Sequence, residues 1–480
     1  MKMWSGRFRE PLDPAFEDWQ RSLRFDWRLL PCEVAASQAH ARALEKLGVL
    51  SQAECTALCR ALDEIVAQFQ AESKSSDPLA TLDHPAAHHA TAEDVHHFVE
   101  LELKQRLGET ALKLHTGRSR NEQIATDLRL YVREATAALI HDLRAWQRAL
   151  LAQAEAVGET VMPAYTHLQR AEPVLVAHWL LAYFEMLTRD TSRLRDCAAR
   201  ADRCPLGSGA VAGATLPLDR VAMAEDLGFS SPTANSMDAT SDRDFLLEFL
   251  QALSQLALHA SRFAEEITLY ATAEFGFVDL PERFATGSSA MPQKKNPDLT
   301  ELTRARAGRI LAAAHNAEFV LKGLPLAYNK DLQDLQEPLF TATREAHLLL
   351  RQLAPFTQAL QLRTDRMRAA CDKGFLNAMA AATYLVHKGI PFRIAHEIVG
   401  HAVRQGLEAG CELGELPLAT LQALSPAFNQ DFFAAVTLQA TLDCHDVAGG
   451  TARHRVAQAL AAARNQVDEQ SNAEVSHARA

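Results

Sequence analysis

The sequence predicts a mainly α-helical protein whose centre is a bundle of long helices, and three observations lead to this prediction. First, three stretches contain neither glycine nor proline, at residues 118–157, 174–204 and 233–275. Second, apolar residues in the first stretch recur every three or four positions, which is the period of an α-helix. Third, the segment FLLEFLQALSQLALHASRFAEE in the third stretch is apolar around nearly its whole circumference, which is typical of a buried helix.

The chain has 480 residues, which is too long for one compact core, so two or three domains are expected. We expect an N-terminal domain over residues 1–117, a central bundle over 118–366 and a C-terminal domain over 367–480. The last is predicted from shorter amphipathic helices after about residue 365. Because the long helices cannot be buried within one small domain, we expect other chains to complete the bundle. No Asn-Gly or Asp-Gly signal predicts a β-hairpin.

The charge balance limits the possible partners. The chain has 49 lysines and arginines against 60 aspartates and glutamates, a net charge of −11, which argues against nucleic acid as a partner. A small anionic substrate is compatible, because the local charge of a site can oppose the overall sign. No secretory signal or membrane span is predicted, so we expect a cytoplasmic protein. Its eight cysteines form no CxxC pair and are expected to be reduced thiols.

The first of three stretches that could carry chemistry is KLHTGRSRNEQIATD, residues 113–127. After Gly117, the residues Arg118, Ser119, Arg120 and Asn121 lead into the long helix. A helix start presents free N–H groups and partial positive charge, so this stretch can bind a carboxylate. The alternative is helix capping with solvated arginines.

The second stretch is MPAYTHLQRAEP, residues 162–173, a proline-bounded link between two long helices. His167 can act as a general acid or base, because the pKa of histidine lies near neutrality. The alternative is a histidine with only a structural role.

The third stretch is GSSAMPQKKNP, residues 287–297. Asn296 is predicted to cap the next helix, with Pro297 in its first position. The lysines at 294–295 and the helix start can stabilise an alkoxide and an anionic intermediate beside the serines at 288–289. The alternative is a flexible basic surface loop.

A group of five histidines occurs in DHPAAHHATAEDVHHFVE, and its members are His84, His88, His89, His96 and His97. No HExxH or comparable ligand spacing is present, so we expect a polar role without a metal. GSGAVAG is neither a GxSxG elbow nor a GxGxxG nucleotide turn. No metal and no cofactor are therefore expected.

Together these stretches resemble the fumarase/aspartase superfamily. GSSAMPQKKNP fits its signature G-S-x-x-M-x-x-K-x-N, with Gly287, Ser288, Met291, Lys294 and Asn296 in place. Within the superfamily the chain is most similar to the argininosuccinate lyases, on KLHTGRSRN, YTHLQRAEP, PLGSGAVAG, NSMDATSDRDF and LAYNKDLQ. The opening MWSGRF and the late DVAGGTA also fit, so the resemblance extends to about residue 465.

The resemblance implies a three-domain fold with a central long-helix bundle completed by formation of a homotetramer. Each active site then takes its three stretches from three different chains. The implied reaction is the reversible β-elimination of argininosuccinate to L-arginine and fumarate, through a carbanion and without a cofactor. Arginine biosynthesis is the implied context.

The resemblance also implies roles for single residues. Ser288 is the base, His167 provides the acid, and Lys294 and Asn296 stabilise the intermediate. Glu301 pairs with the catalytic histidine. The residues implied to bind substrate or line the site are Ser22, Ser119, Arg120, Asn121, Thr166, Arg243, Tyr328 and Gln333.

Three positions differ from the usual family pattern. Gln336 stands where the family usually has a lysine that helps to bind substrate, so substrate affinity or identity can differ. Glu122 replaces the usual aspartate after SRN, and Ala380 stands where members often have an acid. No role is predicted for Lys295.

Two other hypotheses stay open at this point. Gln336 keeps open a sister lyase that releases fumarate from another N-substituted aspartate. An inactive structural member, like the lens crystallins of the family, is the other. Ser288, His167 and Lys294 argue against it, because a structural role needs none of them.

Overall fold

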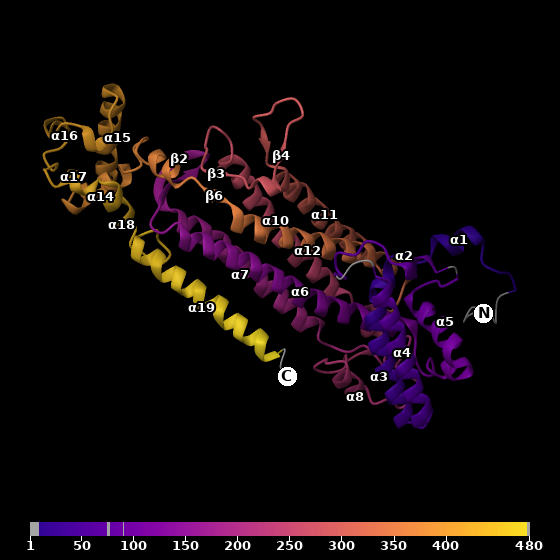
Figure 1. The fold of residues 1–480 in the computed structure, drawn as a ribbon. Helices are drawn as coiled ribbons and strands as arrows, with labels where there is room; N and C mark the ends of the chain where they lie inside the picture. Colours follow the sequence, from indigo (N-terminus) through magenta and orange to yellow (C-terminus); the bar gives the residue numbers. More distant parts are fainter. Residues whose placement is uncertain (1–8, 74–76, 90, 478–480) are drawn as a thin grey trace. The chain divides into compact units, whose positions relative to one another are not determined.

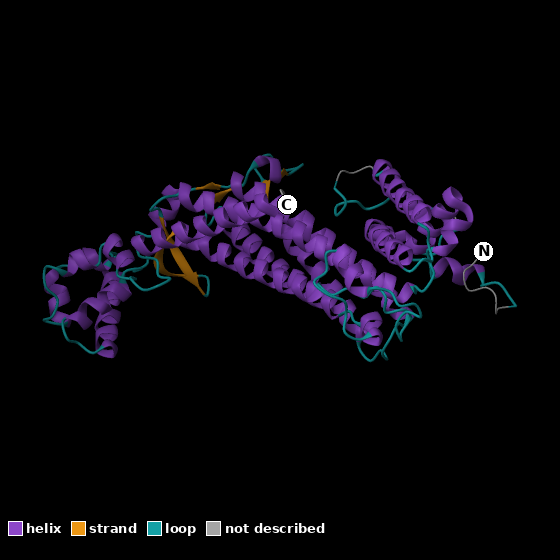
Figure 2. Ribbon diagram, turned by 90° about the horizontal axis from the view of Figure 1, so that it is seen from below, coloured by secondary structure: helices purple, strands orange, loops and turns teal. Residues whose placement is uncertain are grey.

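The computed structural model of the chain describes residues 9–73, 77–89 and 91–477, most of which are helical (Figure 1). The opening MWSGRF lies outside the described residues. Strands within the described ranges are short and form three antiparallel pairs, drawn in orange in Figure 2. The mainly α-helical fold predicted from the sequence is therefore confirmed.

Within the described residues, six helices contain 24 to 37 residues each. They are α6 (Arg120–Ala156), α7 (Val176–Ala201), α10 (Asp244–Tyr270), α11 (Asp298–Leu321), α12 (Gln336–Ala359) and α19 (Arg453–His477). The stretches without glycine or proline contain α6, α7 and α10, so these three predicted helices are confirmed. The third stretch also contains the short helix α9 (Ser236–Ser241), which precedes α10. In the described part of the chain, none of the helices has the length and hydropathy that crossing a lipid bilayer requires.

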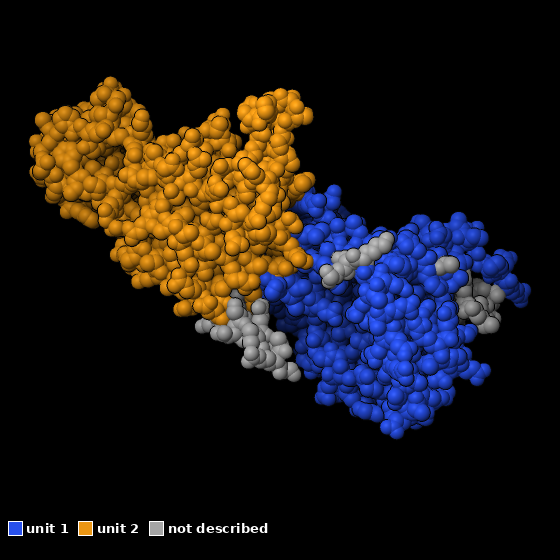
Figure 3. All heavy atoms as spheres, in the orientation of Figure 1, with its two compact units in different colours: residues 1–141, 190–258, 305–349 blue, residues 142–189, 259–304, 350–480 orange. Residues whose placement is uncertain are grey.

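The chain divides into two compact units, which have different colours in Figure 3. Unit 1 consists of Met1–His141, Asp190–Leu258 and Ala305–Leu349, and unit 2 consists of Asp142–Arg189, His259–Arg304 and Leu350–Ala480. The boundaries fall within α6, α7, α10, α11 and α12, so each of these helices contributes one part to each unit. The three consecutive domains expected from the sequence stay a prediction.

The shorter helices of unit 1 are α1 (Pro14–Trp19), α2 (Leu23–Asp26), α3 (Leu30–Lys46), α4 (Gln52–Glu72), α5 (Val95–Leu107), α8 (Arg220–Asp226) and α9. Helix α3 packs against α4 and α5, and Leu44, Leu58 and Val99 are among the residues buried in this unit. Helix α4 begins at a capping box, in which Ser51 Oγ accepts from Glu54 N and the Glu54 carboxylate accepts from Ser51 N. The local sequence alone therefore specifies where this helix starts.

The core of the helical part of unit 2 is centred on Trp146 of α6, which is fully buried. Its indole Nε1 donates a hydrogen bond of 2.9 Å to Thr357 Oγ1 on α12. Its ring meets that of Phe263 on α10 edge to face, with 5.4 Å between the ring centroids. Because the indole N–H has this partner, the large aromatic ring can be buried between three helices without leaving a polar group unpaired.

Three pairs of short strands also belong to unit 2. Strand β1 (Val161–Thr166) pairs with β2 (Gln169–Leu175), β3 (Val278–Asp279) with β6 (Gln361–Leu362), and β4 (Thr286–Gly287) with β5 (Lys295–Asn296). The β1–β2 hairpin was not predicted, because its turn contains His167 and Leu168 rather than glycine. Both residues have positive φ, 54° and 57°, a conformation that non-glycine residues seldom adopt.

The C-terminal helices of unit 2 are α13 (Thr364–Ala370), α14 (Ala378–His387), α15 (Phe392–Ala409), α16 (Leu418–Leu424), α17 (Phe432–Ala435), α18 (Leu438–Asp443) and α19. Helices α14 to α17 enclose a hydrophobic cluster that includes Leu385, Val399, Phe428 and Phe432. Shorter helices after about residue 365 were expected, and α13 to α18 confirm them, whereas α19 is a long helix of 25 residues that the expectation did not include.

Candidate functional site

The predicted site residues fall into two sets, one in each unit. Unit 1 contains Ser22, Ser119, Arg120, Asn121, Arg243, Tyr328 and Gln333, and unit 2 contains Thr166, His167, Ser288, Lys294, Asn296 and Glu301. The geometry of each set is described separately.

In unit 1, five of the predicted residues line one pocket with a volume of about 160 Å³. These five are Ser22, Arg120, Asn121, Tyr328 and Gln333. Segments that are distant in the sequence meet here: the start of α2, the start of α5, the start of α6 and the segment before α12. Local sequence patterns did not predict that these four segments lie together, because their proximity depends on tertiary packing.

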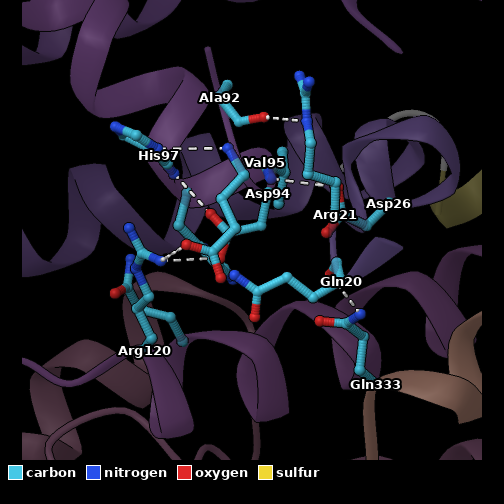
Figure 4. A network of polar contacts seen from close by, with 12 residues as sticks. Gln20, Arg21, Asp26, Ala92, Asp94, Val95, His97, Arg120 and Gln333 are labelled. Atoms are coloured by element: carbon cyan, nitrogen blue, oxygen red, sulfur yellow. Dashed lines mark hydrogen bonds and ion pairs between the residues drawn. The ribbon is translucent and has the colours of Figure 1, made fainter. Parts of the chain in front are cut away.

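Polar contacts fix the walls of this pocket (Figure 4). Asp26 Oδ1 accepts a hydrogen bond of 3.1 Å from Val95 N, which ties the end of α2 to the start of α5. Gln333 Nε2 donates to the carbonyl oxygen of Gln20 at 2.9 Å. Backbone groups are therefore the anchors that hold the N-terminal segment and the segment before α12.

Three carboxylates that the sequence analysis did not single out line the same pocket: Asp26, Glu93 and Asp94. Arg120 Nη1 lies 3.0 Å from Asp94 Oδ2 and 3.8 Å from Glu93 Oε2. Lys330 Nζ lies 3.5 Å from Glu93 Oε1. The signal that could have predicted Asp94 is its position as the N-cap of α5, where its side chain accepts from His97 N. For Asp26 the signal in the sequence was weaker than for Asp94, because it consists only of an acidic residue within an apolar segment.

The pocket perturbs the pKa values of its two aspartates in opposite directions. Burial and the neighbouring charge of Asp94 raise the pKa of Asp26 from 3.8 to about 7. Burial would also raise the pKa of Asp94, but the charges of Arg120 and His96 outweigh it and lower that pKa. Compared with free aspartates, the pocket therefore favours the ionised form of Asp94 and the protonated form of Asp26.

The remaining predicted residues of unit 1 have other surroundings. Ser119 Oγ accepts from Asn121 N at 3.2 Å, and the Glu122 carboxylate accepts from Ser119 N at 2.9 Å, so Ser119 caps α6. Glu122 also accepts from Gly209 N at 2.8 Å, which fixes the glycine-rich loop at residues 205–217. Arg243 is buried, and burial lowers its pKa to about 10. Neither Ser119 nor Arg243 lines the pocket.

A buried charge cluster, formed by Glu33, His96 and Asp127, lies next to the pocket, since His96 belongs to both. His96 Nδ1 is 2.9 Å from Glu33 Oε2 and 3.7 Å from Asp127 Oδ2. Burial would lower the pKa of His96, but the charge of Glu33 outweighs it and raises that pKa to about 9. Gln123 also donates to Glu33, and Arg118 lies 3.9 Å from it. His96 and Arg118 thus pair with Glu33, whereas burial and the charge of Glu33 raise the pKa of Asp127 well above its usual value, and neither oxygen of Asp127 has a hydrogen-bond partner among the described residues.

In unit 2, His167 lies in the exposed turn between β1 and β2. Within the described residues its side chain has no hydrogen bond or ion pair. The positive φ of the turn sets the direction of this side chain, and strained backbone of this kind is frequent at functional positions. Its neighbour Thr166 ends β1 and is also exposed. The predicted pairing of His167 with Glu301 stays a prediction, because no ion pair joins them in the described part of this chain.

Ser288 and Lys294 lie in the loop of the β4–β5 hairpin, which projects from its unit (Figure 1). Ser288 Oγ accepts hydrogen bonds from two backbone N–H groups, of Ala290 at 3.3 Å and of Met291 at 3.1 Å. The loop therefore supplies two N–H donors to the one oxygen that the sequence analysis assigned as the base. Lys294 is exposed.

The start of α11 differs from the prediction by one residue. The carbonyl of Pro297 accepts from Thr300 N and from Glu301 N, so Pro297 rather than Asn296 occupies the cap position. Asn296 is instead part of β5, and its Nδ2 donates to Gly287 O at 3.3 Å. The prediction of an asparagine cap is wrong because strand pairing with β4 holds Asn296 in extended conformation.

The comparisons with known proteins identify the family of the chain. The family model described as "Lyase" matches residues 6–312, and that described as "Argininosuccinate lyase C-terminal" matches residues 375–443. The argininosuccinate lyase of Acidobacterium capsulatum is 66% identical over 98% of this chain and 96% of its own. That of Koribacter versatilis is 55% identical over 97% of this chain and 98% of its own.

The chain belongs to the argininosuccinate lyase family. It is therefore a lyase, and the resemblance inferred from the sequence is confirmed. Among solved structures, EDDS lyase in complex with formate has a TM-score of 0.80 at 25% identity, covering 98% of this chain and 93% of its own. The 3-carboxy-cis,cis-muconate lactonizing enzyme of Pseudomonas putida has a TM-score of 0.70 at 20% identity, covering 94% and 99%, which shows a shared fold.

Two positions at which the resemblance implied a different residue can now be placed. Gln336 lines the unit 1 pocket, and its buried Oε1 has no hydrogen-bond partner among the described residues. A buried unpaired carbonyl oxygen favours a ligand that brings an N–H donor. Ala380 is buried in α14, where a carboxylate would need a partner.

Proposed function

We propose that the chain cleaves argininosuccinate reversibly into L-arginine and fumarate by β-elimination. Membership of the argininosuccinate lyase family supports the substrate. The geometric observation that carries the proposal is the pair of backbone N–H groups, of Ala290 and Met291, that donate to Ser288 Oγ. Serine lacks useful basicity alone, and donors aimed at its oxygen stabilise the alkoxide that can remove a proton.

The chemical difficulty of this reaction is the proton that must be removed. It lies on a carbon beside a carboxylate, where it is very weakly acidic, and its removal spreads negative charge into that carboxylate. Ser288 takes this proton, and Lys294 and Asn296 stabilise the resulting dianion. His167 then protonates the leaving guanidinium nitrogen as the C–N bond breaks, with Glu301 as the partner of the histidine.

The pocket of unit 1 binds the substrate in this proposal. Its three carboxylates, Asp26, Glu93 and Asp94, suit the cationic groups of the arginine end. Ser22, Asn121, Tyr328 and Gln333 add hydrogen bonds, as the family resemblance implies, and burial keeps the Tyr328 phenol protonated by raising its pKa to about 12. Thr166, Ser119, Arg120 and Arg243 complete the substrate-binding set carried over from the family.

We also propose that the chain acts as a cytoplasmic homotetramer whose active sites combine residues of three chains. The exposed apolar side chains Leu258, Leu302 and Phe319 on α10 and α11 support association, because large apolar groups are costly to leave in water. Sedimentation equilibrium should give the mass of four chains. A monomer that retains full activity would contradict this part of the proposal.

The test of the reaction is to mix the purified protein with argininosuccinate and to follow fumarate by its ultraviolet absorbance. Fast turnover supports the proposal. One specific observation favours a second candidate, a sister lyase that acts on another N-substituted aspartate: Gln336 replaces the usual lysine in the pocket. Silence with argininosuccinate but activity on another aspartate adduct would support that candidate. No fumarate from any such substrate would instead indicate the inactive structural member.

A further inference from the structure

The β4–β5 hairpin is too small to hold its own position. Its two strands pair through only two residue pairs, Thr286 with Asn296 and Gly287 with Lys295. Between them, residues 289–294 are exposed. A hairpin of this size is at best marginally stable when isolated, so contacts with the rest of unit 2 must fix where its loop stands.

Two contacts at the base of the hairpin do this. On β4, Thr286 donates from both N and Oγ1 to Asp298 Oδ2, at 2.9 and 2.8 Å, which ties the strand to the start of α11. On β5, Lys295 Nζ donates to Asp279 Oδ1 at 2.6 Å and to the carbonyl of Leu280 at 2.9 Å. The contact of Lys295 is the one that joins the hairpin to a second pair of strands, because Asp279 belongs to β3, which pairs with β6.

We propose that Lys295 is a positioning residue, which through Asp279 and Leu280 fixes the hairpin that carries Ser288, Lys294 and Asn296. Successive side chains of a strand point to opposite faces. Holding Lys295 against Asp279 therefore directs the neighbouring Asn296 to the other face of β5. This inference rests on the proposed function, since it assigns these hairpin residues to the reaction.

The contact between Lys295 and Asp279 is weak, so it can position the hairpin without making it rigid. Lys295 and Asp279 side chains are both 38% exposed, so solvent screens their attraction and salt weakens it further. Arg363 Nη1 lies 3.9 Å from the other oxygen of Asp279, and among the described residues its side chain forms no hydrogen bond or ion pair with the hairpin. Arg363 thus provides a control, because its loss changes the surroundings of Asp279 and leaves the bonds of Lys295 in place.

The experiment measures kcat and KM for fumarate release by Lys295→Met, Lys295→Arg and Asp279→Asn. We expect kcat to fall about tenfold in Lys295→Met and about fivefold in Asp279→Asn, with KM changed less than twofold. Lys295→Arg, which keeps the cation, should retain kcat within twofold of the wild type, and so should Arg363→Met. Thermal unfolding of all four variants checks that the fold is kept.

Two further measurements separate positioning from a general structural effect. The double variant Lys295→Met/Asp279→Asn should be no slower than Lys295→Met alone, because both changes remove the same contact. Raising the salt concentration should lower kcat of the wild type towards that of Lys295→Met and leave the variant unchanged. Equal kcat in wild type, Lys295→Met and Asp279→Asn would overturn the inference, and so would multiplying effects in the double variant. A wild type that releases no fumarate would instead contradict the proposed function.

Discussion

At the scale of single residues, Asp26 is a buried group whose charge state is sensitive to pH near neutrality. Burial and the charge of Asp94 raise its pKa to about 7, while the Ser22 side chain and Val95 N donate to it and oppose the shift. Its carboxyl is therefore protonated in mild acid and ionised in mild base. If the pocket binds the cationic arginine end, the ionised form attracts substrate and the protonated form does not.

We therefore expect kcat/KM for argininosuccinate to rise as the pH increases from about 6 to about 8, because Asp26 ionises in this range. Asp26→Asn should lower kcat/KM at pH 8 and remove this part of the profile. The pH dependence of kcat/KM in both proteins checks this. An unchanged profile in Asp26→Asn would show that another group titrates.

Ser288 gives the second prediction at this scale. Ser288→Ala should lower kcat by about a thousandfold or more, because general bases contribute roughly 10²–10⁴ to rate and no other side chain replaces this oxygen. Its fold should be kept, since Ser288 is only half-buried. The neighbouring Ser289→Ala is the matched control and should keep normal activity. Near-normal activity in Ser288→Ala would show that the base is assigned wrongly.

At the scale of elements, the long helices and the two hairpins are stabilised in different ways. The helices α6, α10 and α12 meet around Trp146, which is packed on all sides and whose single N–H is satisfied by Thr357. The β4–β5 hairpin has few contacts, and those at its base are partly exposed. Mutations in the helices should therefore change stability, and mutations in the hairpin should change activity.

The contact of Trp146 gives a prediction of this kind. Thr357→Val keeps the shape of the side chain but leaves the buried indole N–H without a partner, so the free energy of unfolding should fall by about 1–3 kcal/mol. Thr303→Val is the control, because its hydroxyl only donates to the carbonyl of Leu299 in its own helix. Denaturant titration measures both changes. Equal losses in the two variants would contradict the role assigned to the indole.

At the scale of the whole molecule, buried ionisable groups set the pH range of stability. The pKa of His96 is raised to about 9 in the fold, chiefly by Glu33 acting against burial, so its contribution is complete below 6.5 and is lost as the pH rises through 9. Burial would raise the pKa of Glu33, but His96 outweighs it and lowers that pKa to about 2, so its contribution is lost only below 4.5. Burial lowers the pKa of His40 to about 3, so the fold loses stability as the pH falls from 6.5.

We therefore expect the free energy of unfolding to fall as the pH rises from about 7 to 9, because His96 loses its proton in this range. His96→Gln should remove most of the decrease between about pH 7 and 9. Burial lowers the pKa of His115 to about 4, so His115→Gln is the matched control and should alter only the acid side. Chemical denaturation over this pH range checks both variants. A curve for His96→Gln that parallels the wild type would contradict the assignment.

Features that depend only on neighbouring residues could be predicted from the sequence, whereas features that depend on tertiary contacts could not. The helices α6, α7 and α10 were predictable because their period and their lack of glycine and proline are local properties. The turn at His167 was not, because positive φ at a non-glycine residue is imposed by its surroundings. Asp26 and Asp94 were missed for a related reason: only the folded chain brings α2, α5 and α6 to one pocket.

The β4–β5 hairpin has a consequence for how such a chain can change in evolution. Its loop contributes little to the packing of the helices, so substitutions there alter chemistry with little effect on folding. The unit 1 pocket is the opposite case, because its walls are helix caps and buried charges, and a new substrate there requires compensating changes elsewhere. Exchanging residues 288–294 between relatives should therefore change reactivity with less loss of stability than changes in the pocket. The pocket, which determines which substrate is accepted, should change more slowly.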